Sequence, residues 1–236
     1  MTGQGGGPFQ GIQAITLDLD DTLWPVLPVL AQAERELVEW LAPLTAQTLA
    51  AGRSVLALKS QYPEHAHDMS WLRRRLLHDL LTELHEDPAL ADPAFAVFLE
   101  ARQRVTPWPE VEGILAAWAS RYRIAAITNG NADVHRTPLG PYFSASISAP
   151  AFGAAKPDPR IFHAACDALG VEPGATLHIG DDLELDVLAA RRAGLHAAWL
   201  LRPELGRPSV VNNTERRGAL QPYFFSLLSI DNVVQR

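Results

Sequence analysis

The stretch Ala14-Ile15-Thr16-Leu17-Asp18-Leu19-Asp20-Asp21-Thr22-Leu23 decides how the fold of this chain is interpreted. Its first four residues predict a short buried strand, and three carboxylates follow at the C-terminal end of that strand. Open α/β sheets bind ligands at that end, and side-chain alternation points Asp18 and Asp20 the same way. Two carboxylates that face one spot repel each other unless a cation or a proton lies between them. The stretch therefore predicts a hard-cation site with one nucleophilic carboxylate; the alternative is that the aspartates cap a turn.

Length and composition are those of an ordinary globular protein with one large domain or two small ones. The net charge of −7 gives a nucleic-acid partner no electrostatic support. The single cysteine, Cys166, excludes an internal disulfide and a cysteine-cluster metal site. No apolar run is long enough to span a membrane, and the glycine-rich residues 3–8 predict a floppy tail rather than a signal peptide. We therefore expect a cytoplasmic protein with no nucleic-acid or membrane partner.

A helical pattern without strand signals occupies residues 24–106. Proline-rich connectors at 24–28 and 107–109 bracket this segment, because proline interrupts both helices and central strands. Apolar residues recur at helical spacing in four stretches, near 29–42, 49–61, 68–86 and 92–105, with Asp92 as the cap of the last. We expect a helical bundle at 24–106, inserted after the first strand, and a core made of residues 1–23 and 107–236.

Strands and helices alternate after the second connector. The expected strands lie at 123–128, 145–148, 176–179 and 196–200, and the expected helices at 111–118, 160–169 and 183–193. This alternation predicts an α/β fold with a doubly wound parallel sheet. Residues 227–234 are expected to add an edge element.

Three of the predicted strands end in side chains that carry oxygen atoms. These residues are Asp18 and Asp20 on the first strand, Thr128 and Asn129 on the second, and Asp181 and Asp182 on the fourth, with Asp186 one turn further on. Parallel strands place such ends on one edge of the sheet, where converging carboxylates suit Mg²⁺. The hydroxyl of Thr128 and the amides that follow it can face a phosphate. For Asp181 and Asp182, helix capping is the alternative interpretation.

Lys156 is a cation in an unfavourable place. It precedes Pro157, a favoured first helical residue, and the helix macrodipole opposes a positive charge there. The conflict disappears if an anion or a carboxylate lies beside it. Considered without the other motifs, Lys156 would be interpreted as a solvated surface lysine. Together with the acidic strand ends, it is interpreted as part of the site. The run Arg73-Arg74-Arg75 is typical of a solvated helix face, and the alternative is that one arginine holds a second anionic group of a substrate.

In their order and at these strand ends, the residues closely resemble the four motifs of the haloacid dehalogenase-like superfamily. The matching segments are 18–22, 128–130, 156–159 and 180–182 with Asp186. The helical insert is similar to the C1-type cap of that superfamily. The stretches 126–132 and 178–183 look most like bacterial phosphatases that act on flavin mononucleotide and the flavin-precursor phosphate.

The resemblance implies a Mg²⁺-dependent phosphatase that works through an aspartyl-phosphate. Asp18 would attack phosphorus, and Asp20 would protonate the leaving oxygen and then activate water. Mg²⁺ would bind the carboxylates of Asp18 and Asp181 and the backbone carbonyl of Asp20. The superfamily's dehalogenases and ion-pumping ATPases resemble one another in lacking a carboxylate two residues after the nucleophile, so Asp20 favours a phosphatase.

The remaining motif residues would bind the substrate or support the site. The resemblance implies that Thr128, the Asn129 amide and Lys156 hold the phosphoryl oxygens. It also implies that Asp186 orients Lys156 or the water molecules on the metal, and that Asp182 could share the metal role. The expected substrate is a small phosphorylated metabolite. The enzyme alternatives are a phosphomutase and a sugar or nucleotide phosphatase of the same fold. A phosphate-responsive, receiver-like module is the alternative that is not an enzyme.

Overall fold

The computed structural model describes residues 9–47, 54–206, 223–224 and 226–234. The tail predicted at residues 3–8 lies outside these described residues. No helix in the described ranges has both the length and the apolar character needed to cross a membrane.

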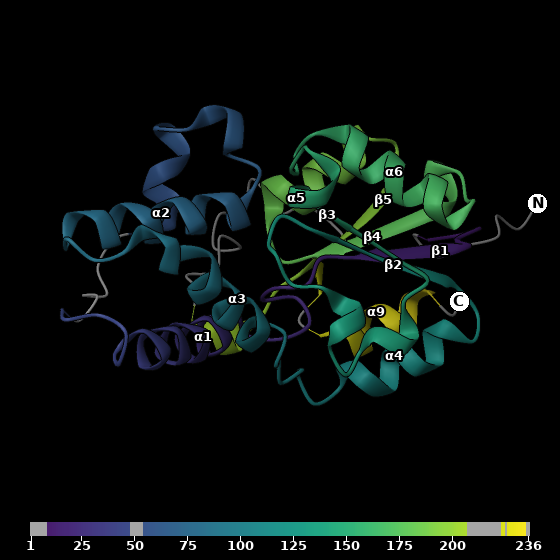
Figure 1. Cartoon of the computed structure of the whole chain (residues 1–236). Helices are drawn as coiled ribbons and strands as arrows, with labels where there is room; N and C mark the ends of the chain where they lie inside the picture. The colour runs from purple at the N-terminus through teal and green to yellow at the C-terminus, as the bar shows by residue number, and fades with distance from the viewer. Residues whose placement is uncertain (1–8, 48–53, 207–222, 225, 235–236) are drawn as a thin grey trace, which may run out of the picture.

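A six-stranded sheet forms the larger part of the molecule (Figure 1), and every strand pair in it is parallel. Its strands are β1 Ala14–Leu17, β2 Arg123–Thr128, β3 Ala145–Ser148, β4 Thr176–Gly180, β5 His196–Leu200 and β6 Tyr223–Phe224. The order is β3-β2-β1-β4-β5-β6, so the chain winds outward in both directions from β1. The predicted doubly wound parallel sheet is confirmed. The carboxyl ends of β1 and β4, which are neighbours, lie at the switch point where such sheets bind ligands.

Both faces of the sheet are covered by helices, which explains why its strands are almost continuously apolar. One face packs on α4 Val111–Ala119 and α9 Leu227–Val234, and the other on α5 Ala149–Phe152, α6 Pro159–Leu169 and α7 Ala189–Arg192 (Figure 1). Alternation along β1 sends Ile15 and Leu17 to the first face and Ala14 to the second. Cys166 is buried on α6 beneath the second face.

The helices within residues 24–106 pack mainly on one another. They are α1 Val26–Leu41, α2 Met69–Glu83 and α3 Ala91–Arg102, with 3₁₀ turns η1 Val55–Ser60, η2 Pro63–His65 and η3 Pro88–Leu90. Their shared core includes Leu37 from α1, Leu81 from α2 and Phe95 from α3. In Figure 1 these helices lie to one side of the sheet. The domain boundaries at 23/24 and 106/107 stay a prediction.

Short 3₁₀ turns and one π-helix connect the elements of the core. They are η4 Val134–Arg136, η5 Gly140–Tyr142, η6 Pro173–Ala175, the π-helix η7 Leu183–Leu188, and η8 Pro203–Leu205.

Three local predictions were wrong, and the helix predicted at 183–193 is present but differs in its first turns. The stretch 49–61 forms only the 3₁₀ turn η1 within its described part, and residues 48–53 lie outside the description. Asp92 lies inside α3 instead of capping it, because η3, capped by Asp87, runs directly into that helix. The segment 183–193 begins as the π-helix η7. Residues 227–234 form the covering helix α9, and the edge strand is β6.

Candidate active site

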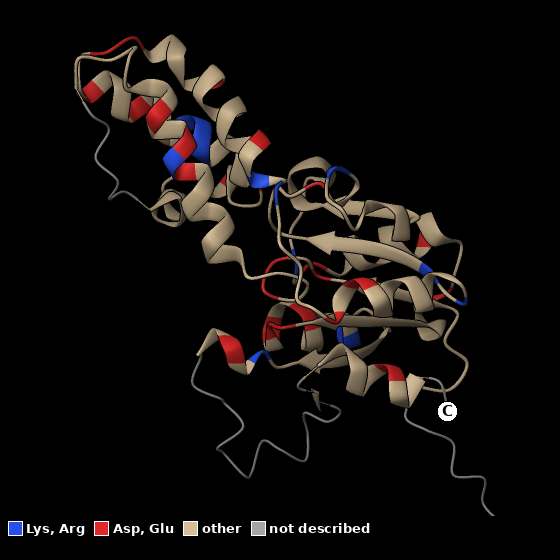
Figure 2. Ribbon diagram, turned by 90° about the horizontal axis from the view of Figure 1, so that it is seen from below, with Lys and Arg blue, Asp and Glu red and all other residues tan. Residues whose placement is uncertain are grey.

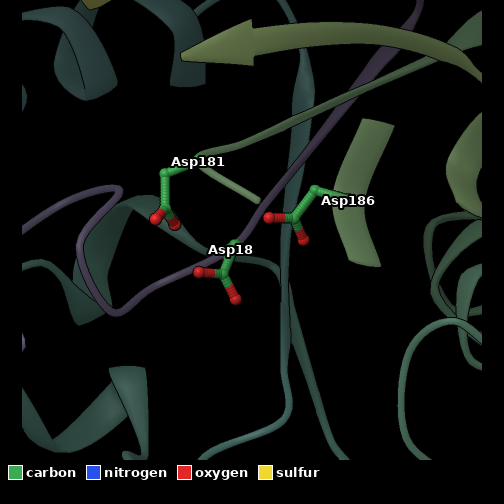
Figure 3. A group of neighbouring side chains, drawn as sticks. All are labelled: Asp18, Asp181 and Asp186. Atoms are coloured by element: carbon green, nitrogen blue, oxygen red, sulfur yellow. The ribbon is translucent and has the colours of Figure 1, made fainter. Parts of the chain in front are cut away.

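Carboxylates from two neighbouring strand ends converge at the switch point of the sheet. Asp18 directly follows β1, Asp181 follows β4, and Asp186 lies on η7, the segment that leaves β4. One oxygen from each of the three carboxylates lies within 4.8 Å of the others. Figure 3 shows the three side chains turned toward a common space, and Figure 2 shows acidic loop segments gathered between the sheet and the helical insert. The convergence predicted from parallel strand ends is therefore present.

Lys156 closes this acidic group. Its Nζ atom lies 2.6 Å from Oδ1 of Asp18 and 2.6 Å from Oδ1 of Asp186, and the residue is 4% exposed. The reasoning that placed Lys156 at a helix start was wrong, because α6 begins at Pro159 with Asp158 as its cap. Two carboxylates, rather than a helix terminus, account for the buried cation.

Burial and charge shift the ionisation of these groups in different directions. Burial raises the pKa of Asp18 well above its usual value, and Lys156 offsets this effect only in part. Burial alone would also raise the pKa of Asp186, but Lys156 and the ring N–H of His178 outweigh it and hold that pKa well below the usual range. Burial alone would lower the pKa of Lys156; the two carboxylates raise it instead. Lys156 contacts two of the three carboxylates, Asp18 and Asp186, so an additional cation would stabilise the ionised form of Asp18.

The end of β2 is bonded to the lysine loop. The side-chain amide of Asn129 donates to the backbone carbonyl of Lys156 at 2.9 Å and accepts from the backbone N–H of Lys156 at 2.7 Å. The hydroxyl oxygen of Thr128 accepts from the Gly130 amide at 3.0 Å. The side chain of Asn129 therefore positions Lys156, which is compatible with a phosphate role for its backbone amide.

Asp20 stands outside the group of three carboxylates. The indole N–H of Trp24 donates to its Oδ1 atom at 2.9 Å, and Nη2 of Arg102 contacts Oδ1 at 2.6 Å and Oδ2 at 2.5 Å. The next aspartate, Asp21, accepts from the backbone N–H of Val26 at 2.8 Å at the start of α1. The turn-capping alternative therefore applies to Asp21.

Asp182 and Asp186 have distinct structural tasks. The Asp182 carboxylate accepts from the Glu184 and Leu185 amides and so caps η7, as the alternative interpretation proposed. Asp186 accepts the backbone N–H of Asp182 through Oδ2 at 3.0 Å, while its Oδ1 faces Lys156 and His178. Donors on both oxygens therefore orient Asp186.

Sequence reasoning missed several residues that hold the site. His178, buried on β4, contacts Thr16 at 2.9 Å and Asp186 at 3.2 Å; its signal was a lone histidine in an apolar strand. Arg202, after β5, donates to the carbonyl of Thr22, whose hydroxyl in turn donates to Asp181 at 3.1 Å. Arg102 carried no signal beyond its place at the end of an apolar helix.

The arginine run of α2 takes no part in this site. Arg73 pairs with Glu34, Arg74 lies 3.6 Å from Asp92, and Arg75 lies 3.0 Å from Asp79. These salt bridges join residues within the insert. The alternative that one of these arginines holds a substrate anion has no support from the geometry.

The sequence of the chain matches the family model of haloacid dehalogenase-like hydrolases over residues 12–194. The chain belongs to this family. The 5-amino-6-(5-phospho-D-ribitylamino)uracil phosphatase YigB of Escherichia coli K12 is 34% identical over 84% of this chain and 87% of its own length. The phosphoserine phosphatase of Thermus thermophilus is 32% identical over 82% of this chain and 91% of its own.

A solved structure agrees with this assignment. The crystal structure of a 2-haloacid dehalogenase from Pseudomonas syringae pv. Tomato DC3000 has a TM-score of 0.80 and 33% identity, covering 95% of this chain and 99% of that one. The resemblance inferred from the motifs is confirmed: the chain is a haloacid dehalogenase-like hydrolase, and phosphatases are among its relatives.

The donor set of this hydrolase fits a hard divalent cation. Asp18 and Asp181 supply carboxylate oxygens on adjacent loops, and Thr22 donates to both, at 3.5 Å and 3.1 Å. Oxygen donors of this kind suit Mg²⁺. Asp186 fits less well as a direct ligand, because both of its oxygens already accept hydrogen bonds from protein donors.

Replacement of Gly130 by alanine is expected to lower activity about 10- to 100-fold, because small displacements of catalytic groups have effects of this size. A Cβ atom there would lie 2.9 Å from Oδ2 of Asp20 and 3.3 Å from Oγ1 of Thr128. Gly113→Ala on α4 is the matched control, since a Cβ there meets nothing within 4 Å. The control should keep its activity and gain about 0.5–1 kcal/mol in stability. Equal kcat/KM values for the two variants would contradict the placement of Asp20.

His178 predicts a pH dependence of stability. Burial lowers the pKa of His178, so the folded state keeps it neutral while the unfolded state binds a proton below a pH of about 6.5. Its contribution is therefore present above pH ~6.5 and is lost as the pH falls, by up to ~1.4 kcal/mol per pH unit. Urea unfolding between pH 5 and 8 should show a shallower decline for His178→Gln than for the wild type. Parallel curves would show that His178 does not change its protonation on unfolding.

Proposed function

We propose that the chain hydrolyses a small phosphomonoester with Mg²⁺ through an aspartyl-phosphate at Asp18. The observation that carries the proposal is the contact of Lys156 with both Asp18 and Asp186, beside Asp181. A buried ammonium that touches a carboxylate at the switch point can hold that carboxylate and an incoming phosphoryl group together.

Two chemical steps follow from the residues. In the first, a carboxylate oxygen of Asp18 attacks phosphorus, the phosphorus–oxygen ester bond breaks, and Asp20 gives its proton to the leaving oxygen. In the second, Asp20 takes a proton from water, which attacks the aspartyl-phosphate, and inorganic phosphate leaves. Lys156, Thr128 and the Asn129 amide hold the phosphoryl oxygens in both steps.

Mg²⁺ held by Asp18, Asp181 and the Asp20 carbonyl would neutralise negative charge on the phosphoryl group. Asp186 keeps Lys156 in place, and Asp182 shapes the turn that carries Asp186. The cytoplasmic location expected from the sequence stays a prediction.

The structural relative described as a dehalogenase raises a second candidate, dehalogenation. Asp20 favours the phosphatase, because an alkoxide needs a proton to leave and a halide does not. The carboxylate of Asp20 faces Gly130 in the loop proposed to bind phosphate, where it is in place to serve such an oxygen. Measurement of halide release from a 2-haloacid beside phosphate release from an ester separates the two.

A cleft of about 490 Å³ adjoins the loop proposed to bind phosphate, and the residues that line this cleft indicate which substrate it would accept. Its lining includes Ser70 and Leu99 from the insert and Asn131, Ser146 and Ser148 from the core. Ser148 pairs with Thr128 in the sheet, so the cleft begins beside the proposed phosphoryl site. No Lys or Arg occurs among its described lining residues, whereas hydroxyl and amide groups suit a polyhydroxylated leaving group. We therefore propose flavin mononucleotide or the ribityl flavin-precursor phosphate as substrate, in line with the YigB relative.

The first test is hydrolysis of p-nitrophenyl phosphate with and without EDTA. Mg²⁺-dependent turnover supports the class, and a long-lived phosphorylated protein without turnover favours the receiver-like alternative. A panel of flavin mononucleotide, the flavin precursor, sugar phosphates, nucleotides and phosphoserine then tests the substrate. We expect kcat/KM to be at least tenfold higher for the two flavin compounds than for phosphoserine. No preference for them over sugar phosphates would refute the finer assignment and leave the class intact.

A further inference from the structure

Arg102 places a buried positive charge beside Asp20. It is the last residue of α3, in the helical insert, and only 1% of it is exposed. Its Nη2 atom contacts both carboxylate oxygens of Asp20, which lies 82 residues earlier on the loop after β1. The pair therefore joins the insert to the catalytic edge of the sheet.

Stability alone does not account for this arginine. Burial of a guanidinium is costly, and replacement of a buried ion pair by apolar groups is often neutral or stabilising. The Nη1 atom of Arg102 is also buried without a hydrogen-bond partner among the described residues, which adds to the cost. A group kept at such expense next to an acid–base residue points to a role in the reaction.

The two carboxylate oxygens of Asp20 have different sets of hydrogen-bond donors. Oδ1 accepts hydrogen bonds from the Trp24 indole and from Arg102, whereas Arg102 is the single described donor to Oδ2. Oδ2 is also the oxygen that faces the phosphate loop, since a Cβ on Gly130 would lie 2.9 Å from it. Oδ2 thus has fewer described donors than Oδ1, and it lies on the side where the leaving oxygen is proposed to depart.

We propose that Arg102 is a positioning residue that holds Oδ2 of Asp20 toward the phosphoryl group. The inference rests on the proposed phosphatase function. In the first step Asp18 gains the phosphoryl group, the ester oxygen gains the proton from Asp20, and an alcohol leaves. Asp20 is then ionised and faces the guanidinium, which keeps it oriented to take a proton from water in the second step.

This role predicts a dependence on the leaving group. An alkyl phosphate releases a basic alkoxide and needs the proton, whereas p-nitrophenyl phosphate releases a stable phenolate and needs it little. A variant in which Asp20 swings away should therefore lose more activity on the alkyl phosphate. A residue that merely stabilises the fold would lower both activities together.

The test compares kcat/KM for the best alkyl phosphate of the panel with kcat/KM for p-nitrophenyl phosphate. In Arg102→Met the ratio of alkyl to aryl activity should fall about 10- to 100-fold, within the range of general acid catalysis. Arg102→Lys keeps the charge and should restore part of the ratio. Arg104→Met is the matched control. Arg104 lies two residues after Arg102, is exposed and pairs with Glu36, so the Arg104→Met variant should show the wild-type ratio.

A double-mutant cycle with Asp20→Asn shows whether Arg102 acts through Asp20. The ratio of Asp20→Asn should be the same with and without Arg102→Met. A wild-type ratio in Arg102→Met, or a further fall of the ratio in the double variant, overturns the proposal. If Arg102→Met does not fold, Arg102→Lys decides: an equal loss on both substrates counts against positioning. Absence of Mg²⁺-dependent turnover on either substrate in the wild type would instead be a failure of the proposed function.

Discussion

Asp18→Asn is expected to lower phosphatase activity by at least about 10⁴-fold while leaving the protein folded. An amide oxygen does not attack phosphorus, so no aspartyl-phosphate forms. The substitution is nearly isosteric, and it removes one negative charge from a group of three carboxylates, two of which contact Lys156. Because burial already raises the pKa of Asp18, its negative charge is unfavourable in the folded state, and loss of that charge is not expected to destabilise the protein.

Steady-state kinetics with p-nitrophenyl phosphate and urea unfolding test both parts of this expectation. Asp92→Asn is the matched control, since Asp92 is an exposed residue on α3 whose nearest cation is Arg74 at 3.6 Å. The control should keep wild-type kcat and KM. An Asp18→Asn variant with more than about 0.01% of wild-type activity would be incompatible with Asp18 as the nucleophile.

Lys156→Met is expected to destabilise the protein by ~3–5 kcal/mol, the usual effect of removing one partner from a buried ion pair. The ammonium group lies 2.6 Å from each of two buried carboxylates, so its loss leaves Asp18 and Asp186 to repel each other without compensation. Activity should fall as well, because the proposed phosphoryl site loses its cation. Urea unfolding at pH 7 in EDTA measures the stability term without a divalent cation.

Lys59→Met provides the control, since Lys59 is the other lysine of the chain and lies on η1 in the insert. Lys59 is partly exposed, and its substitution is expected to change stability by no more than ~0.5 kcal/mol. Similar stabilities for the two variants would show that Lys156 does not neutralise the carboxylates. In that case the proposed electrostatics of the site would have to be abandoned.

The sheet was predictable because its strands are short apolar runs whose ends are marked by polar residues. The expected strands at 123–128, 145–148 and 196–200 agree with β2, β3 and β5, and β1 follows the run that opened the interpretation. Parallel pairing places the ends of these strands on one edge of the sheet, and the strand order, which the structure supplies, makes β1 and β4 neighbours and so brings Asp18 and Asp181 together. The part of the site built from strand ends was therefore accessible from sequence.

Contacts between distant side chains were not accessible. Arg102 and Asp20 are 82 residues apart, and Thr16 and His178 are 162 apart; neither pair leaves a pattern that periodicity can detect. Local signals also failed where two residues were each suited to the first position of a helix, as with Pro157 and Pro159 near the start of α6. The π-helix η7 also left no sequence signal: its cap, in which Asp182 accepts from the Glu184 and Leu185 amides, is the same as that of an α-helix.

Mass spectrometry of acid-quenched protein tests most directly whether Asp18 accepts a phosphoryl group. The wild-type protein is mixed with p-nitrophenyl phosphate and Mg²⁺, quenched within one turnover and digested. We predict that the peptide containing Asp18 gains the mass of one phosphoryl group, and that this gain is absent from Asp18→Asn. Rapid turnover with an unmodified Asp18 peptide, or with phosphate on another residue, would contradict the account.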